Sequence, residues 1–315
     1  MMREGKLTVA LLSGGKSAER EVSLKGGREV FEALDKERYR IIRFDPRDDL
    51  PRLAREASEI DAALIVLHGR LGEDGTIQGF LESLGVPHQG SGVLGSALAM
   101  NKIVSKQIYL QAGLPVAPFV VADRRSPAAP ESIVERLGLP LVVKPEHEGS
   151  SIGLSIVRDA ERLAEAVEDG WRYDRRCLVE KFIEGREITC AILGNDTLEA
   201  LPLVEIIPGD AYEFFDYEAK YTPGASREIC PADLPEELAE KARRYALGAH
   251  QALYCRGCSR TDMIVAAEEI YLLETNTIPG MTATSLLPQA AAAAGISFSA
   301  LLDRLISLAI ENGKG

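Results

Sequence analysis

Short apolar segments alternate with helix-patterned segments through the first third of the chain. Apolar runs occupy residues 6–12, 38–45 and 61–69, and the amphipathic segment 21–34 separates the first two. Strands joined by crossover helices are typical of a parallel sheet, because parallel neighbours cannot be connected by a tight turn. This alternation therefore predicts an N-terminal parallel α/β domain.

Later segments are organised differently. An amphipathic stretch over residues 93–113 leads into GLPVAPF, whose prolines interrupt the helical pattern, so we place a boundary near residue 100. The segment between residues 209 and 233 is irregular, and loops of that length often cover a functional site, so we expect a lid there. The predicted domains are 1–100, 101–185 and 186–315, which makes the chain α/β, or α+β overall.

The charge balance excludes several classes of partner. The chain has 48 acidic and 36 basic residues, a net charge of −12, which repels nucleic-acid phosphates and anionic lipid. No apolar run reaches the roughly 18 residues of a membrane span, and the N-terminus has no secretory pattern. We therefore expect a cytoplasmic protein that binds neither nucleic acid nor membranes.

The five cysteines are an odd number, which fits a reducing compartment better than a disulfide framework. Cys255 and Cys258 form a CxxC pair. A redox or zinc site needs a thioredoxin-like setting or a second ligand pair, and the four histidines provide none nearby. We favour buried structural thiols, with a redox or metal site as the alternative.

Two segments near the C-terminus carry oxygen-bearing side chains at strand spacing. SRTDMIV places Asp262 on one expected strand, and YLLETNTIPG places Glu274 and Asn276 two residues apart on the next. A hairpin turn at AAEE brings them to one face, because alternate residues of a strand point the same way. Oxygen ligands without His or Cys suit Mg²⁺ or Mn²⁺. The alternative is that these acidic residues face solvent.

Lys144 ends the apolar run LPLVV and precedes the loop EGSSIG. A lysine at a strand end, followed by the backbone amides of such a loop, can bind phosphate through charge and N–H donors together. The alternative for this segment alone is an ordinary turn, since neither a Walker A motif nor a GxGxxG opening is present. Lys102 and Lys220 belong to two other segments, and we expect them to close onto the same phosphates. The alternative for each lysine taken singly is a solvated surface position.

The segment LVEKFIEGREI mixes apolar residues with Glu180 and Glu187, a composition expected for an adenine and ribose pocket. Many unrelated sequences share that composition. Its weight comes from the motifs that surround it.

Seven motifs occur in one order along the chain: GGKSAEREVSL, HGRLGEDGTIQG, GSGVLGSALAMNK, VVKPEHEGSSIG, DYEAKY, RTD and LLETNTIPGMTATSLLP. Together they closely resemble the D-alanine–D-alanine ligase family. The similarity runs from about residue 7 to beyond residue 300, and HGxxGEDG with NTxPGMTxxS is a highly specific pairing.

The resemblance implies a three-domain ATP-grasp fold in which ATP lies between the central and C-terminal lobes. It assigns two ions of Mg²⁺, or Mn²⁺, to Asp262, Glu274 and Asn276. The residues implied to contact the nucleotide are Lys102, Lys144, Glu148, Ser150, Ser151, Glu180, Lys181, Phe182, Ile183, Glu187, Phe214 and Lys220.

The resemblance also implies where the first D-alanine lies. Glu19 would receive its ammonium group, and His68 would lie near it. Glu19, Ser150 and Tyr221 resemble the family's hydrogen-bonded triad, which orients loops and substrates.

Four further residues are implied to act on the second substrate and the intermediate. Arg260 and the Gly280 amide resemble an oxyanion site, while Ser285 and Leu286 would hold the second carboxylate with a hydroxyl and helix N-terminal amides. The implied reaction joins two D-alanines through a D-alanyl phosphate, for peptidoglycan precursor synthesis, in a homodimer. The alternatives are a related ATP-grasp carboxylate–amine ligase with a different amino-acid or D-lactate preference, and a catalytically silent nucleotide-binding protein.

Four positions depart from the commonest family pattern. Glu146 and His147 replace a small polar and basic pair, Phe182 stands where tryptophan is frequent, and Asn101 where aspartate is common. The implied metal and triad positions are intact. The departures concern base packing and nucleotide affinity.

Tyr221 generates a prediction about the product. In the family that the chain resembles, tyrosine at this position accompanies dipeptide formation and phenylalanine accompanies joining of D-alanine to D-lactate, since the hydroxyl completes the triad's hydrogen bonds. We expect mainly dipeptide when the protein is given ATP, D-alanine and D-lactate near neutral pH, with products identified by mass. Predominant depsipeptide would contradict this prediction.

Overall fold

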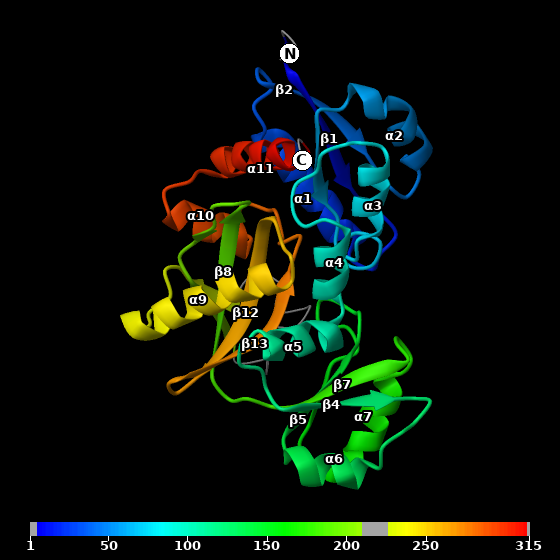
Figure 1. Cartoon of the computed structure of the whole chain (residues 1–315), viewed down its shortest axis with the longest axis vertical. Coiled ribbons are helices and arrows are strands. Elements are labelled where there is room, and N and C mark those ends of the chain that lie inside the picture. The colour runs from blue at the N-terminus through cyan, green and yellow to red at the C-terminus, as the bar shows by residue number, and fades with distance from the viewer. Residues whose placement is uncertain (1–4, 210–225, 314–315) are drawn as a thin grey trace.

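The computed structural model describes residues 5–209 and 226–313, in which the strands form three separate sheets (Figure 1). The N-terminal domain and a central lobe lie at opposite ends of the long axis, and the C-terminal sheet lies between them. Phe214, Lys220 and Tyr221 fall outside the described residues, so the structure places none of these three predicted site residues.

The N-terminal sheet is parallel, with strand order β2-β1-β3, which confirms the predicted parallel α/β domain. Val9 and Leu11 of the central strand pack into one core, and Ala10 and Leu12 pack into another on the opposite face. A strand buried on both faces is apolar throughout, which explains the run seen in the sequence. The elements are β1 (Leu7–Ser13), α1 (Arg20–Ala33), β2 (Tyr39–Phe44), α2 (Leu50–Glu56), the 3-10 helix η1 (Ala57–Glu59), β3 (Ala62–Val66) and α3 (Thr76–Ser83).

The amphipathic stretch 93–113 forms two helices, α4 (Val93–Met100) and α5 (Lys102–Gln111). Asn101 divides them because its extended backbone cannot continue α4, while its side chain accepts a hydrogen bond of 3.0 Å from the Val104 amide and caps α5. Both helices pack against the C-terminal sheet.

The central lobe is a four-stranded antiparallel sheet of order β4-β7-β5-β6. Its helices cover one face only, and Val143 packs beneath them while Val142 and Lys144 line a cleft on the other side. The strands therefore alternate between core and cleft. The elements are β4 (Phe119–Asp123), α6 (Pro130–Leu137), β5 (Leu141–Pro145), β6 (Ser155–Val157), the 3-10 helix η2 (Ala160–Arg162), α7 (Leu163–Gly170) and β7 (Arg176–Lys181).

The C-terminal sheet is also antiparallel, with order β11-β10-β8-β12-β13 and with β9 paired to β8. The long helix α9 packs on one face of it. The elements are β8 (Arg186–Gly194), β9 (Glu199–Ala200), β10 (Val204–Pro208), β11 (Ser226–Ile229), α9 (Glu236–Ala252), β12 (Gly257–Ala266), β13 (Glu269–Asn276), α10 (Leu286–Ala293) and α11 (Phe298–Asn312).

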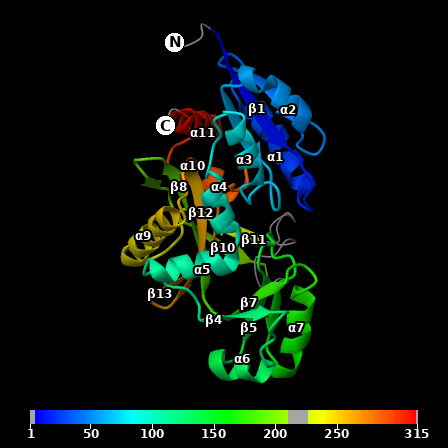
Figure 2. The same ribbon diagram turned by 45° about the vertical axis from the view of Figure 1, so that its right-hand side comes forward.

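The last helix returns to the first sheet, as both views show (Figures 1 and 2). Leu301 and Leu305 of α11 share one core with Leu11 and Leu64 of the N-terminal sheet, and Leu193 of β8 joins the same core. The N-terminal domain is therefore held against the C-terminal sheet by buried apolar contacts as well as by the chain that connects them.

The loop predicted over residues 209–233 is wrong in part. Residues 226–229 form β11, which pairs antiparallel with β10 so that Ile206 lies opposite Glu228. An edge strand of four residues has too little apolar pattern to be recognised in a polar segment. Residues 210–225 of the predicted lid lie outside the described residues.

The described residues contain no single helix that is long and apolar enough to cross a membrane. Within that part of the chain, only α10 and α11 taken together have the required length and composition, and the two helices are bent by 105°.

The CxxC cysteines behave as structural thiols. All five cysteines are free, and burial raises the pKa of Cys255 to about 11 and that of Cys258 to about 12. Both thiols therefore stay protonated at neutral pH, which makes them poor nucleophiles and poor metal ligands.

His250 generates a prediction about acid stability. It is buried on α9, its Nδ1 lies 2.7 Å from the Ser259 hydroxyl, and burial lowers its pKa from 6.5 to about 4. The unfolded chain takes up a proton near pH 6.5 and the folded chain does not, so stability falls as pH drops from 6.5 toward 4, by about 3 kcal/mol in all.

We measure the free energy of unfolding with urea. Between pH 7 and pH 4 we expect it to fall by about 3 kcal/mol more for the wild type than for His250→Gln, whose side chain cannot titrate. Gln251→Ala, at the exposed neighbouring position, should follow the wild-type profile. Parallel profiles for the wild type and His250→Gln would show that the histidine does not couple folding to pH.

Candidate active site

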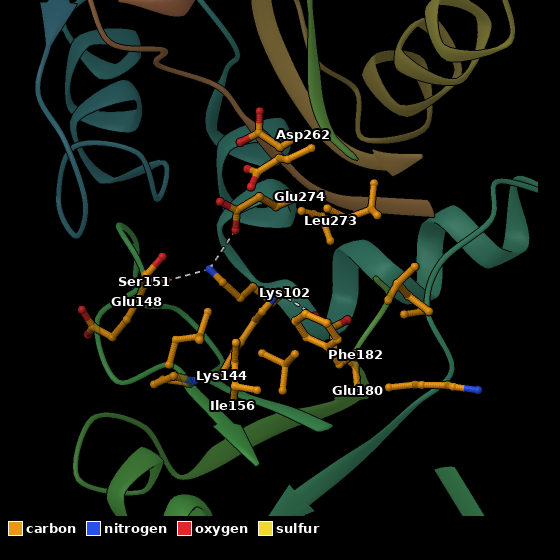
Figure 3. A pocket seen from close by; sticks show the side chains of 18 of the residues that line it. Lys102, Lys144, Glu148, Ser151, Ile156, Glu180, Phe182, Asp262, Leu273 and Glu274 are labelled. Carbon is orange, nitrogen blue, oxygen red and sulfur yellow. Dashed lines mark hydrogen bonds and ion pairs between the residues drawn. The ribbon is translucent and has the colours of Figure 1, made fainter. Parts of the chain in front are cut away.

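A cleft of about 950 Å³, part of it open to solvent, lies between the central sheet and the C-terminal sheet. In Figure 3, Lys144, Ile156 and Glu180 approach it from the central lobe, while Asp262 and Glu274 approach from the C-terminal hairpin. Of the predicted nucleotide and metal residues, those lining the cleft are Lys102, Lys144, Glu148, Ser150, Ser151, Glu180, Lys181, Phe182, Ile183, Glu187, Asp262 and Glu274.

The acidic side chains are brought together by the pairing of β12 with β13. Asp262 lies opposite Glu274, and Arg260 lies opposite Asn276. A β-bulge next to Asp262 leaves Leu273 without an opposite residue, and both Leu273 and Glu274 line the cleft. The predicted hairpin is therefore confirmed, with a bulge that the alternating pattern did not predict.

Asp262 is held by four hydrogen bonds. Arg260 donates two, of 2.9 and 2.7 Å, and Thr189 donates one of 2.6 Å from β8. Asn276 donates the fourth, of 3.0 Å, through its amide nitrogen. Burial alone would lower the pKa of Arg260, but the adjacent Asp262 carboxylate raises it above its usual value, so the guanidinium stays charged.

The donor set fits a hard divalent ion. The described residues contain no group of three or more His, Cys, Asp and Glu side chains that could hold a metal, so the candidate is two carboxylates and one amide. Carboxylate and amide oxygens are ligands for Mg²⁺, which completes its shell with water and phosphate oxygens. Because Asn276 turns its nitrogen toward Asp262, its oxygen is the atom left to serve as a ligand.

Lys102 links the hairpin to the loop after β5. Its ammonium group donates a hydrogen bond of 2.6 Å to the Glu148 carbonyl and lies 3.3 Å from the Glu274 carboxylate (Figure 3). Within that loop Ser150 and Ser151 have positive φ angles of 49° and 60°, which are unusual for residues other than glycine. The loop is thus held in a specific shape beside the acidic pair.

Lys144 is paired with Glu180 across the central sheet at 2.6 Å, and a second lysine, Lys106 of α5, lies 2.7 Å from the other Glu180 oxygen. Burial would raise the pKa of Glu180, but the two ammonium groups lower it to about 2. Burial also opposes the charge on Lys144, and Glu180 raises its pKa above the usual value. All three groups are therefore placed by one another.

The other end of the cleft is apolar. Phe182 and Ile183, which follow β7, line this end together with Val142 and Ile156 of the same lobe. Ile264 of β12 lines the cleft from the C-terminal sheet. The Arg158 guanidinium lies 5.8 Å from the centre of the Phe182 ring. Such walls suit a flat heteroaromatic group, and Glu187, which also lines the cleft, has a carboxylate that can accept hydrogen bonds.

Contacts between domains continue this site toward the N-terminal domain. The Ser150 hydroxyl donates a short hydrogen bond to Glu19, a buried residue that precedes α1. His68 follows β3 and is buried beside Glu73 at 4.0 Å; burial opposes its protonation, but Glu73 raises its pKa. Glu19 and Arg260 both lie close enough to His68 to affect its charge.

The remaining predicted residues lie at the start of α10. Ser285 precedes the helix, and its side chain accepts a hydrogen bond of 3.1 Å from the Thr282 amide. A Cβ on Gly280 would come within 2.9 Å of the Ser285 hydroxyl oxygen, so only glycine fits there without a shift. Gly280 and Ser285 therefore lie against each other, and Leu286 is the first residue of the helix.

Comparison with known proteins identifies the family. Residues 108–307 match the family described as D-ala D-ala ligase C-terminus, and residues 45–91 match the one described as D-ala D-ala ligase N-terminus. A D-alanine–D-alanine ligase of Syntrophobacter fumaroxidans is 72% identical over 311 residues, which cover 99% of this chain and 100% of that protein. The chain belongs to the D-alanine–D-alanine ligase family.

Further members of the D-alanine–D-alanine ligase family agree. A ligase of Desulfotalea psychrophila is 56% identical, with 99% of this chain and 98% of that protein covered. The crystal structure of a D-alanine–D-alanine ligase from Bacillus anthracis complexed with ATP matches with a TM-score of 0.86 and 36% identity, over 98% of this chain and 99% of that one. These likenesses confirm the three-domain ATP-grasp fold.

In this member of the D-alanine–D-alanine ligase family, two polar residues that contact site residues were not predicted from the sequence: Lys106, beside Glu180, and Thr189, beside Asp262. Lys106 has no motif around it, and its position on an amphipathic helix gives no signal of burial. Thr189 lies in a continuous β-strand run, and only the neighbouring strand reveals that its hydroxyl meets Asp262. The sequence also did not predict that Val142, Ile156 and Ile264 form apolar walls of the cleft, because the pairing of the strands decides which side chains face it.

Proposed function

We propose that this protein joins two D-alanines into D-alanyl-D-alanine at the expense of ATP, as a cytoplasmic homodimer that supplies a peptidoglycan precursor. The observation that carries the proposal is the cleft in which Asp262 and Glu274 face Lys102 and Lys144 from other elements. The ATP-bound relative from Bacillus anthracis, with the same fold, supports ATP as the nucleotide.

In this proposal the adenine lies between Phe182, Ile183 and the apolar residues of both sheets, with Glu180, Lys181 and Glu187 at its polar edges. The phosphates extend toward Lys102, Lys144 and the loop that carries Glu148, Ser150 and Ser151. Lysines contributed by separate elements compensate locally for the acidic character of the whole chain. Phe214 and Lys220 are proposed nucleotide contacts that lie outside the described residues.

Asp262, Glu274 and Asn276 would hold Mg²⁺, or Mn²⁺, as a pair of ions. When bound, the metal neutralises charge on the phosphate oxygens. The chain's own contribution is geometric: the register of β12 and β13 presents these oxygens on one face, and Thr189 and Arg260 fix the orientation of Asp262.

The first D-alanine would bind with its ammonium group at Glu19, near His68. Ser150 orients Glu19 through their hydrogen bond, and Tyr221, outside the described residues, would complete the triad. The second D-alanine would place its carboxylate at Ser285 and Leu286, where the hydroxyl and the N-terminal amides of α10 converge.

The reaction proposed for this geometry has two steps. The first carboxylate oxygen attacks the γ-phosphorus, the bond to the β-phosphate oxygen breaks, and ADP and a D-alanyl phosphate result. The deprotonated amine of the second D-alanine then attacks the acyl carbon, and the bond between that carbon and the bridging phosphate oxygen breaks. Inorganic phosphate leaves with that oxygen, the nitrogen gives up one proton to the departing phosphate or to water, and the peptide bond remains. Arg260 and the Gly280 amide would stabilise the tetrahedral oxyanion.

Glu274 tests this proposal most directly. Glu274→Ala removes one oxygen-donating side chain and the partner of Lys102, so we expect ATP-dependent dipeptide synthesis to fall about a thousandfold or more. Dipeptide is measured by mass and phosphate release in parallel, at several Mg²⁺ concentrations.

The matched control is Glu269→Ala, which removes a glutamate from the other end of the same strand, where the side chain is 63% exposed. It should keep wild-type activity. If the wild type forms no dipeptide from ATP, Mg²⁺ and D-alanine, or if Glu274→Ala remains as active as the control, the proposed function is wrong.

A further inference from the structure

Lys106 is a buried lysine that takes no part in the proposed nucleotide, metal and substrate contacts. Lys106 is 1% exposed; it lies behind Glu180 and does not line the cleft. Its ammonium group lies 2.7 Å from one Glu180 oxygen, on β7 of the central lobe, and 3.3 Å from the Leu272 carbonyl, on β13. It therefore contacts both walls of the cleft from its position on α5.

Burying a lysine is unfavourable for stability. Desolvation lowers the pKa of Lys106 despite the attraction of Glu180. Replacing a buried ion pair by apolar side chains is often neutral or even stabilising, so packing alone gives no reason for an ammonium group here. A role connected with the charge itself accounts better for its presence.

The charge is shared in a specific way. Lys144 and Lys106 bind opposite oxygens of the single Glu180 carboxylate, at 2.6 and 2.7 Å. Two ammonium groups on one carboxylate leave a net charge of +1. Lys144 is the member with access to the cleft, since its side chain is 14% exposed and that of Lys106 is 1% exposed. The excess positive charge therefore acts on the cleft, where an anion can meet it.

We propose that Lys106 is a positioning residue for phosphate binding: by sharing the charge of Glu180, it leaves Lys144 with enough positive charge to hold an anionic phosphate in the cleft. This inference rests on the proposed function, because it takes the anion to be the triphosphate of ATP. Without Lys106, Glu180 and Lys144 form a neutral pair, and Lys144 attracts phosphate less strongly. The bond to the Leu272 carbonyl additionally keeps β13 at a fixed distance from this pair.

The test compares affinity for a non-hydrolysable ATP analogue with affinity for adenosine, measured by competition with a fluorescent nucleotide at constant Mg²⁺. The ratio of these two affinities reports the contribution of the phosphates, because both ligands contain the base and the effects on its binding cancel. For Lys106→Met, which keeps the length of the side chain without its charge, we expect the ratio to fall roughly tenfold. The KM for ATP should rise correspondingly, with a smaller change in kcat.

The decisive variant is the double substitution Lys106→Met with Glu180→Gln. This double variant again has a net charge of +1, carried by Lys144 alone. The ratio of the affinity for the ATP analogue to the affinity for adenosine should therefore recover toward the wild-type value, although a second buried group has been changed. Glu180→Gln alone completes the cycle and should not lower the ratio. A purely structural role for Lys106 predicts the opposite, namely that the double variant is at least as impaired as Lys106→Met.

Val167→Ala is the control for general destabilisation. It removes volume from the core of the central lobe, on the face of the sheet away from the cleft, and should lower the melting temperature while leaving the ratio unchanged. If Lys106→Met behaves like Val167→Ala, or if the double variant fails to recover, the positioning role is overturned. If the wild type itself binds no ATP analogue, the proposed function fails first and this inference fails with it.

Discussion

The pairing of β12 with β13 is the constraint on which the candidate site depends. Because Asp262 lies opposite Glu274, two like charges are held on one face of the sheet, an arrangement that is unfavourable unless cations balance it. Arg260 balances the first carboxylate, and Lys102 lies 3.3 Å from the second. The bulge beside Asp262 lets an apolar residue and an acidic residue from adjacent positions of β13 line the same cleft.

Local charge compensation also explains how an acidic chain can present a site for an anionic nucleotide. The net charge of −12 would repel a triphosphate if it were spread evenly. Instead, Lys102 and Lys144 line the cleft and Lys106 lies directly behind it, each within 3.3 Å of a glutamate carboxylate oxygen. The glutamates orient the lysines, and Glu180 raises the pKa of Lys144 against the effect of its burial.

Much of this arrangement was accessible from the sequence. The N-terminal parallel sheet follows from apolar strands buried on both faces, and the acidic hairpin follows from alternation around a turn. Strand β11 and the burial of Lys106 were not accessible, because each depends on a partner distant in sequence: β10 with β11, and Glu180 with Lys106. Periodicity reports which face of an element is apolar and does not report what that face meets.

The same long-range contacts explain why the site is shared by three parts of the chain. Helix α11 fixes the N-terminal domain to the C-terminal sheet through a common core, whereas the central lobe meets the N-terminal domain through polar contacts such as Ser150 with Glu19. Apolar cores separate only at a large free-energy cost, while partly exposed hydrogen bonds exchange readily with water. The N-terminal domain is therefore joined to the C-terminal sheet by a shared apolar core, and to the central lobe by polar groups beside the cleft.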